Sequence, residues 1–440
     1  MQSLEQKEVA LPLVAAGRTG GGWRGRHSGR LFEWLPACLR QSGMAIAALA
    51  TACAAASAQA PVSFEVVLGS GTVLAVDSIR STADGGLECT PKGGARRVVP
   101  AGELLAIHGA PVVPPALPAA HLVGDELVRG ALVGGDRNGD RLDVLSPVLG
   151  TVPIQVDRLA LWAGPDVPPL LPLELPEGVD EALFVRAKVG FDVIAGTLHQ
   201  FGAAGVRFQP EGGEPRWFGA NDFVALRLRP EPAPSTAPVA WLTTRTGDRV
   251  RVDRWRCDGE AFVVVVHGGT ELRLRSVDLA SLTCLGGGAV FASDLEPSEV
   301  QQTGVDGDVV YGWQRDRNVL GAPLQVAGRS HGKGLGVHSR SRLSFRVPTG
   351  ATRFWTRVGL DDSVQALPLL PDVAVRIELD GKVVFRRDGL GAGQIVDPGP
   401  LPVVAGSTVV LEVDFGRGRD LGDRVDWLSP VFLPAVVRRP

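Results

Sequence analysis

The sequence predicts an all-β protein in which tandem small β-barrel-like repeats, of the SH3 or Sm kind, precede a longer antiparallel β-sandwich. Its 56 Gly and 33 Pro residues give the frequent punctuation that suits short strands joined by turns. Short stretches such as Arg249 to Val252 alternate charged and apolar residues, as a half-buried strand requires. A chain of 440 residues also exceeds one ordinary core, so we expect several domains.

One β pattern recurs roughly every 45–60 residues between residues 62 and 285. Each copy has a strand, a Gly-containing turn, two further strands with turns, a short strand and a final apolar step. Pro-rich joints, which are stiff and extended, separate the copies. Because each copy is small for an independent core, we expect neighbouring copies to pack on one another. The expected units are β repeat 1 at 61–110, β repeat 2 at 119–163, β repeat 3 at 180–229 and β repeat 4 at 238–286.

Residues 1–60 are expected to form a leader with a secretory signal peptide. A basic region precedes the apolar stretch from Met44 to Ala56, and Ser57-Ala58-Gln59-Ala60 supplies a small-residue cleavage pattern. The apolar run is too short to span a bilayer permanently. We therefore expect a secreted, periplasmic or cell-surface protein. A start at Met44 and a lipoprotein acylated at Cys53 are the open alternatives.

Charge excludes two classes of partner. The formal net charge is −3 although the leader is basic, so the remaining chain is mildly acidic. Binding to nucleic acid or to an anionic membrane surface needs clustered positive charge. We therefore expect no nucleic-acid partner and no binding to an anionic membrane surface, and the short apolar run of the leader predicts no membrane span.

The repeats contain no complete metal-binding motif. Asp136-x-Asn138-x-Asp140 begins like a calcium loop, but Gly139 is misplaced and Pro147 stands where a bidentate Glu belongs. We interpret it as a solvated turn. The histidines of the repeats are scattered singly, without the spacing of a zinc site.

Three cysteines follow the leader, too few for a disulfide scaffold. Cys257 and Cys284 bracket one repeat and can pair in an oxidising compartment. The alternative is that both, together with Cys89, are small buried hydrophobic residues.

The last third, 288–436, has a different character, with six longer strand candidates and hairpin turns such as Asp380-Gly381. Its landmarks, in order, are Phe291 to Leu295, Arg317 to Leu324, Gly332 to Ser339, Val358 to Ser363, Leu379 to Phe385 and Asp426-Trp427. This ordered set resembles the NPCBM family, also known as carbohydrate-binding module family 51, over about a third of the chain. The resemblance implies a jelly-roll β-sandwich. Family members sit beside glycosidases and bind galactose-type sugars, and many others occur without an enzyme.

A sugar is held by an aromatic face stacked on its C–H groups and by planar polar side chains that reach its hydroxyls. Four polar candidates lie in or just after the matched motifs and are expected to converge at one end of the sandwich; alternatively they cap strands and fix loops. Two tryptophans are candidate stacking platforms, or else core residues. The candidate ligand-binding residues are His338, Arg340, Asp361, Asp362, Trp313 and Trp355.

The sequence thus predicts an exported, non-catalytic carbohydrate-binding protein whose partner is a glycan or glycoconjugate. The alternative is a structural or interaction scaffold that contacts another envelope protein without binding sugar, which the apolar loop from Ser363 to Pro371 favours. No catalytic residues are expected, because the adjacent Asp361 and Asp362 diverge rather than flank a bond. No cofactor is expected, and a structural calcium ion in the C-terminal module is left open.

Overall fold

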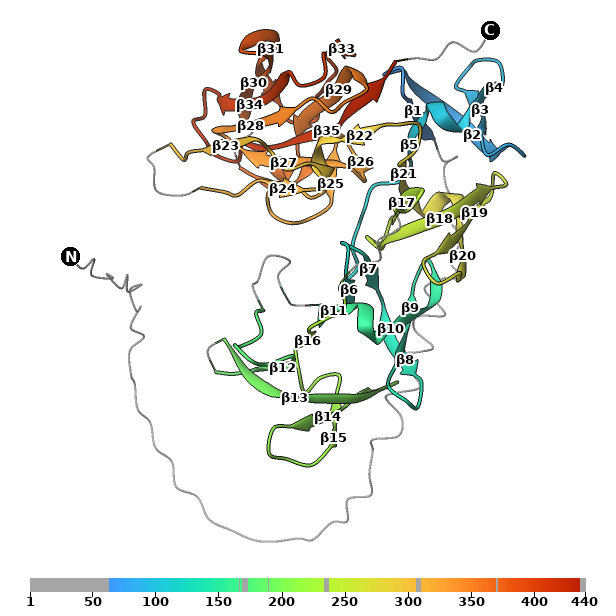
Figure 1. The fold of residues 1–440 in the computed structure, drawn as a ribbon, viewed down its shortest axis with the longest axis vertical. Coiled ribbons are helices and arrows are strands. Elements are labelled where there is room, and N and C mark those ends of the chain that lie inside the picture. The colour runs from blue at the N-terminus through green and yellow to red at the C-terminus, as the bar shows by residue number, and fades with distance from the viewer. Residues whose placement is uncertain are drawn as a thin grey trace, which may run out of the picture. The chain divides into compact units, whose positions relative to one another are not determined.

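The computed structural model describes residues 63–165, 167, 173–188, 190–232, 237–305, 310–368 and 371–435. The proposed leader and its cleavage site therefore lie outside the described residues. Within them the secondary structure consists of β-strands and short 3-10 turns (Figure 1), which confirms the all-β class. No helix of the described part is long and apolar enough to cross a membrane.

Unit 1 shows the arrangement that recurs three more times. Its elements are β1 (Phe64–Leu68), β2 (Val73–Ser81), β3 (Leu87–Pro91), β4 (Arg97–Val99), the 3-10 turn η2 (Ala101–Glu103) and β5 (Leu104–His108). Consecutive strands pair antiparallel, and β5 returns to pair with β1. The spatial order is therefore β5-β1-β2-β3-β4. Strand β4 pairs with β3, and β5 pairs with β1, but no pairing joins β4 to β5, so the small sheet of this unit stays open rather than closing into a barrel.

Units 2, 3 and 4 repeat this order with one difference, and in each the last strand pairs with the first. In unit 2 the three strands before the last one form a separate three-stranded sheet. Unit 2 contains β6 (Ala119–Leu122), β7 (Leu127–Arg129), β8 (Ala131–Gly135), β9 (Arg141–Ser146), β10 (Gly150–Gln155), η3 (Val156–Arg158) and β11 (Leu159–Ala163). Unit 3 contains β12 (Glu181–Arg186), β13 (Phe191–Gly202), β14 (Gly205–Pro210), β15 (Arg216–Gly219) and β16 (Ala225–Leu228). Unit 4 contains β17 (Ala240–Thr244), β18 (Arg249–Cys257), β19 (Ala261–Val266), β20 (Glu271–Arg275), η4 (Ser276–Asp278) and β21 (Leu279–Cys284).

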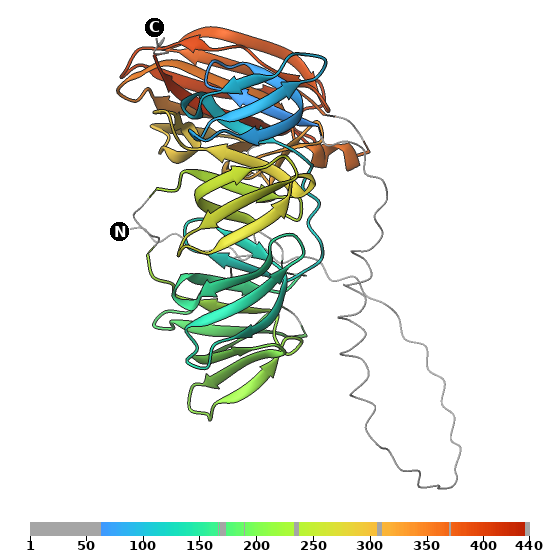
Figure 2. The same cartoon turned by 90° about the vertical axis from the view of Figure 1, so that its right-hand side faces the viewer.

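The units join in pairs through their last strands. Strand β11 of unit 2 pairs with β16 of unit 3, whereas β5 of unit 1 pairs with β21 of unit 4, which is far away in the sequence. One cluster of buried apolar side chains runs through all four units. Figure 2 shows the units as separate groups of strands in successive colours. The copies therefore pack on one another, but not all in chain order.

The C-terminal module is a sandwich of two antiparallel sheets. The first sheet has the order β24 (Gln314–Arg315), β27 (Gly334–His338), β35 (Arg424–Pro434), β29 (Ala351–Leu360) and β32 (Ile395–Val396), with β22 (Val290–Phe291) and β33 (Leu401–Pro402) at its sides. The second has the order β23 (Glu299–Gln302), β28 (Ser341–Arg346), β34 (Thr408–Phe415), β30 (Asp372–Leu379) and β31 (Lys382–Gly391). A hairpin of β25 (Leu324–Val326) and β26 (Arg329–His331) and the 3-10 turns η5 (Ala292–Asp294) and η6 (Asp362–Ala366) complete the module.

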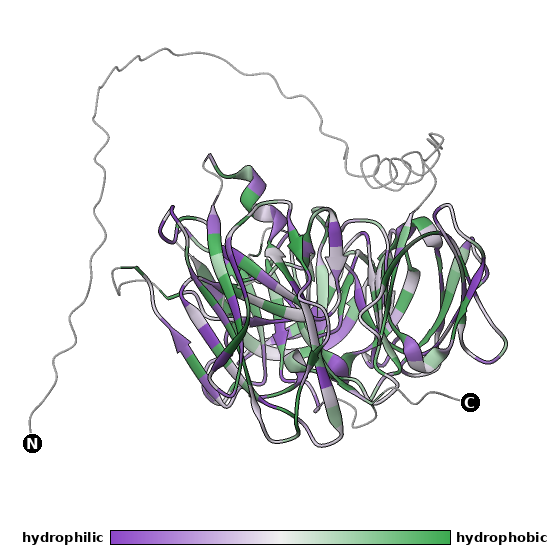
Figure 3. Ribbon diagram, turned by 90° about the horizontal axis from the view of Figure 1, so that it is seen from above, coloured by the Kyte–Doolittle hydropathy of each residue, from purple (hydrophilic) through white to green (hydrophobic). Residues whose placement is uncertain are grey.

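Alternation along the strands builds the core between these sheets. On β28, Leu343 and Phe345 are fully buried, while Arg342 and Arg346 point to the other face. The same alternation of hydrophobic and hydrophilic residues recurs along the strands in Figure 3. Buried Trp427 and Phe432 of β35 contribute from the first sheet. The apolar inner faces thus form one core, and the outer face of the second sheet carries polar side chains such as Arg342.

The module packs against units 1 and 4. Trp355, Phe291 and Val431 form a buried apolar cluster with Val67 and Leu105 of unit 1. Two buried ion pairs cross the same junction, Arg357 with Glu65 at 2.8 Å and Arg249 with Asp316 at 2.9 Å. Figure 1 shows the blue strands of unit 1 next to the red strand β35 of the module.

Two sequence interpretations concern the repeats directly. Asp136 Oδ1 accepts hydrogen bonds from the backbone N–H groups of Asp140 and Arg141, as in a turn. Cys89, Cys257 and Cys284 are buried and free, so Cys257 and Cys284 are not paired here. Burial raises the pKa of Cys284 to about 12, which keeps its thiol protonated.

Candidate functional site

Several strand ends of the module meet at one edge, which we call the loop end. Strand β27 ends at His338 opposite Arg424, where β35 begins, and β29 ends at Leu360 opposite Val425. The second sheet contributes the start of β28 and the end of β34 at Phe415. Because loop residues follow each of these strand ends, side chains far apart in the sequence come together here.

An exposed aromatic ring lies over a histidine at the loop end. Tyr311 is 45% exposed, and its ring centroid is 4.5 Å from that of His338 with an interplanar angle of 30°. Gln302 fixes the Tyr311 segment, because its Nε2 donates to the Tyr311 carbonyl and its Oε1 accepts from the Trp313 N–H. One face of the tyrosine therefore rests on His338, and the side chain still offers surface to solvent.

The imidazole of His338 is neutral and oriented. Burial lowers its pKa, and its Nδ1 lies 3.0 Å from the Ser339 carbonyl oxygen. Since a carbonyl oxygen only accepts, we assign the ring proton to Nδ1. The other nitrogen, Nε2, then carries a lone pair and can accept a hydrogen bond.

A buried carboxyl group with a raised pKa lies next to this histidine. Asp423 Oδ2 accepts a hydrogen bond of 2.6 Å from Ser339 Oγ, while its Oδ1 has no partner among the described residues. Burial, reinforced by Asp420 and Asp372, raises the pKa of Asp423 to about 7. This carboxyl group therefore changes its protonation near neutral pH.

Arg340 is exposed at the rim of the loop end. Its Nε donates to Asp414 Oδ1 at 2.9 Å, and its guanidinium lies over the Phe415 ring at 5.1 Å. Burial opposes ionisation of Asp414, but its hydrogen bonds, chiefly that from Arg340, outweigh burial and lower its pKa. The arginine is thus held in place while its two terminal nitrogens make no hydrogen bond within the described residues.

Asp361 and Asp362 lie at the same end but bind their own chain. Asp361 is 1% exposed and accepts from Asn318 Nδ2 and from the backbone N–H of Ser363. The two oxygens of Asp362 accept from the N–H groups of Ala327 and Gly328. Asp361 therefore caps η6 and Asp362 holds the β25–β26 hairpin, as the alternative interpretation of the sequence has it, and ligand contact through either residue stays a prediction.

The two candidate tryptophans differ in how deeply they are buried. Trp313 is partly buried against the module core, with the Arg315 guanidinium 4.9 Å above its ring. Trp355 is fully buried, and its Nε1 donates to Asp397 at 3.0 Å. The expectation that Trp355 offers a stacking face is corrected, because the contact with unit 1 covers it.

The described part of the apolar loop after Asp362 does not form an exposed apolar surface. Val364 is fully buried in the module core and Leu367 packs partly against it. Leu367 also lies close to the backbone of Gly422, where a Cβ would meet its Cδ1 at 2.4 Å. Leu369 and Leu370 lie outside the described residues.

Sequence reasoning missed Tyr311, Ser339 and Asp423. The only signal for Tyr311 was that it is the single tyrosine of the chain. Among the described residues, no group of three or more His, Cys, Asp or Glu side chains is placed to hold a metal ion.

Comparison with protein families identifies the module. Residues 288–433 match the NPCBM/NEW2 domain, and this C-terminal region is therefore an NPCBM/NEW2 domain. The match leaves the four β units unassigned. No curated protein is found to match the chain.

Solved structures similar to parts of the chain include two from Clostridium perfringens. One is the family 51 carbohydrate-binding module of GH95 in complex with methyl-galactose, with 23% identity, a TM-score of 0.28, and coverage of 33% of this chain and 99% of that one. The other is the second such module of ZmpB with GlcNAc and INT domains, with 19% identity, a TM-score of 0.29, and coverage of 42% and 40%. The assignment of the module rests on the family match.

Proposed function

We propose that the protein is an exported, non-catalytic glycan-recognition protein whose C-terminal module binds sugar at the loop end. The membership of the module in the NPCBM/NEW2 family supports carbohydrate binding. The proposed position of the sugar site rests on Tyr311, an exposed ring beside the oriented polar groups of His338 and Arg340. Export rests on the pattern of residues 1–60.

The groups at the loop end match the chemistry of a sugar. The C–H face of a pyranose ring stacks on the exposed part of Tyr311. A hydroxyl at the ring edge donates to His338 Nε2, and another accepts from a terminal nitrogen of Arg340. A hydrogen bond to a charged group contributes about 1.5–3 kcal/mol, so the arginine contributes more than a neutral donor would.

The first test is the loss of the aromatic ring. We expect Tyr311→Ala to weaken binding of methyl-galactoside or N-acetylglucosamine by the full chain at least tenfold, as measured by isothermal titration calorimetry. Trp217→Ala is the matched control, because Trp217 is 56% exposed but lies on β15 of unit 3. Equal binding by both variants, with unchanged thermal unfolding, would place the sugar elsewhere.

A second candidate is a scaffold that holds envelope proteins without binding sugar. The observation in its favour is that the four β units make up most of the described chain and bury one face of the module through Trp355 and Phe291. A folded full chain that binds no glycan on an array would favour this candidate over the first.

A further inference from the structure

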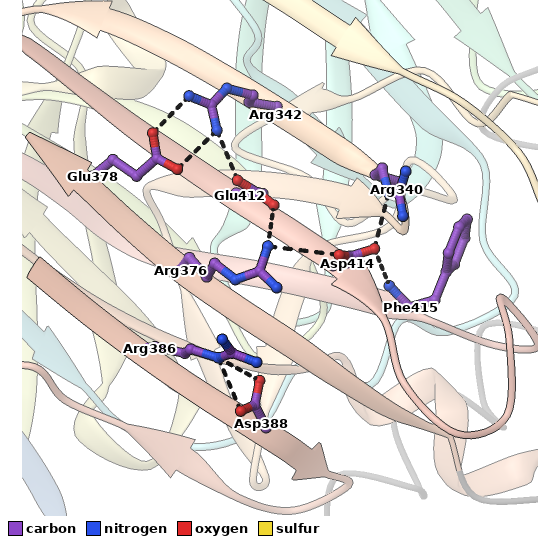
Figure 4. A network of polar contacts seen from close by, with 9 residues as sticks. All are labelled: Arg340, Arg342, Arg376, Glu378, Arg386, Asp388, Glu412, Asp414 and Phe415. Atoms are coloured by element: carbon purple, nitrogen blue, oxygen red, sulfur yellow. Dashed lines mark hydrogen bonds and ion pairs between the residues drawn. The ribbon is translucent and has the colours of Figure 1, made fainter. Parts of the chain in front are cut away.

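The outer face of the second sheet of the module carries a row of charged side chains. Strand register places Gln301 opposite Arg342, Arg342 opposite Glu412, and Glu412 opposite Arg376. The row therefore crosses β23, β28, β34 and β30 at one level, on the face opposite the apolar core. Figure 4 shows Arg342, Glu412 and Arg376 of this row pointing toward one another across the strands.

Ion pairs lock the row. Arg342 donates to both oxygens of Glu378, at 3.0 and 2.6 Å, and also to Glu412 Oε2 at 2.7 Å. The other oxygen of Glu412 accepts from Arg376 Nη1 at 2.6 Å. A bidentate pair of this kind fixes both side chains in one plane, so little side-chain entropy remains to be lost when a ligand binds.

A hollow of about 440 Å³ opens over this row and reaches the loop end. This volume falls in the range of roughly 300–1,000 Å³ that small-molecule sites occupy. The link to the loop end is Arg340, whose backbone N–H donates to the Thr303 carbonyl oxygen at 3.1 Å, with the reciprocal bond at 3.1 Å. The residues that line the hollow are Gln301, Thr303, Arg340, Arg342, Glu412 and Asp414.

Accepting the sugar site at Tyr311 proposed above, we propose that this charged hollow is a second subsite, so that the module takes a neutral oligosaccharide of two or more rings. The first ring stacks on Tyr311, and the chain continues past Arg340 onto the row of Arg342 and Glu412. Guanidinium N–H groups donate to hydroxyl oxygens there, and carboxylates accept from hydroxyl protons.

The charge balance selects the ligand class. Three arginines and three carboxylates alternate in and beside the hollow: Arg340, Arg342, Arg376, Glu378, Glu412 and Asp414. Because each charge already has its counter-charge, a uronic or sialic acid would meet a carboxylate beside every arginine. A neutral sugar presents only hydroxyl dipoles, which fit between the paired charges without displacing them.

The test measures chain-length dependence with the full chain. Probes are galactose and N-acetylglucosamine as single rings, and N-acetyllactosamine and lacto-N-tetraose as longer neutral chains, with 3′-sialyllactose as the acidic comparison. We expect the longer neutral chains to bind at least tenfold more tightly than the single rings, and 3′-sialyllactose to bind more weakly than lactose, its neutral counterpart.

Variants then test which residues cause the tighter binding of the longer chains. We expect Glu412→Gln and Arg342→Gln to remove most of the tenfold gain for longer chains and to leave single-ring binding unchanged. Arg386→Gln is the matched control, because Arg386 pairs with Asp388 on the same sheet but outside the hollow (Figure 4). Thermal unfolding of each variant checks that the module is intact.

The outcomes separate the two proposals. Single-ring binding that depends on Tyr311 but does not improve with chain length would overturn the second subsite alone. A length-dependent gain that survives both hollow variants would also overturn it. If the folded parent binds none of these sugars, both proposals are wrong.

Discussion

Two equivalent sheet faces of this protein are covered by different partners. In the pair formed by units 1 and 4, Ile107 of β5 lies opposite Leu282 of β21; in the pair formed by units 2 and 3, Trp162 of β11 lies opposite Leu226 of β16. All four of these residues point into the shared core. Their strand neighbours therefore form the same outer face in each pair. The C-terminal module covers the first face, and the chain segment that contains Leu173 covers the second.

The two faces differ in polarity at matching positions. His108 and Ser281, which lie opposite each other in the first pair, correspond to Ala163 and Ala225 in the second. Thr243 of β17, next to Ser281, corresponds to Phe184 of β12. The first face thus buries polar groups against the module, whereas the second buries an apolar cluster under Leu173.

This difference shows what kind of sheet face each covering segment requires beneath it. A folded module has polar strand edges of its own, so the face that receives it needs matching charged partners such as Glu65 for Arg357. A single covering segment needs only apolar surface. We therefore expect the first junction to respond to charge and to pH, and the apolar cluster under Leu173 to respond to side-chain volume.

The largest expected effect is the loss of a buried charge partner. Arg357→Ala leaves Glu65 buried without its ion pair at 2.8 Å, with only Arg329 nearby at 3.7 Å. We expect the free energy of unfolding to fall by about 3–5 kcal/mol, as for other broken buried pairs, in urea titrations. Arg386→Ala breaks an exposed pair and should leave the free energy of unfolding nearly unchanged. Equal costs for the two variants would contradict the importance of this junction.

The next effect is acid sensitivity of two histidines at the junction. His108 of unit 1 and His331 of the module have ring centroids 4.4 Å apart, and none of their ring nitrogens has a hydrogen-bond partner among the described residues. The charged groups around them are Glu65, Arg357 and Arg329. Burial lowers the pKa of His108 to about 4 and that of His331 well below its usual value.

Because these pKa values are lower in the folded state, the unfolded chain binds more protons, and stability is lost as pH falls from about 6.5 toward 4. For His108 the loss amounts to about 3 kcal/mol. Buried Asp423 titrates with the opposite sign, so the readout is the difference between variants. We expect His108→Gln to remove about 2–3 kcal/mol of the acid loss in urea titrations at pH 7 and pH 4.5. An unchanged acid profile in His108→Gln would refute this role.

The smallest effect belongs to the second face. Leu173 is 8% exposed, and Leu173→Ala should cost about 2 kcal/mol, at the low end for a buried leucine, with no dependence on pH between 4.5 and 7. Leu421→Ala is the control, because Leu421 is 67% exposed. A pH-dependent cost at Leu173 would erase the contrast between the two faces.

Strand positions could be predicted from the sequence because they depend on local alternation. The residues from Val250 to Trp255, for example, lie within β18. The pairing of β5 with β21 could not be predicted, because alternation fixes the faces of a strand and not its distant partner.

The same limit explains the candidate site. His338 lies within a matched motif and Arg340 directly follows it, so both could be named from the sequence. The burial of Trp355 depends on unit 1, and Tyr311 lies outside every motif. Whether an aspartate binds a ligand or caps a turn depends on backbone N–H groups that the fold supplies, as Ala327 and Gly328 do for Asp362.

The most direct measurement uses the single tyrosine of the chain. Selective ¹³C labelling of tyrosine gives one set of ring resonances, which report on Tyr311 alone during titration of the full chain with N-acetyllactosamine. The account predicts a saturable shift of these resonances at the sugar concentrations at which calorimetry detects binding. Ring resonances that stay unchanged while the sugar binds would contradict the site, and the absence of any binding would contradict the proposed function.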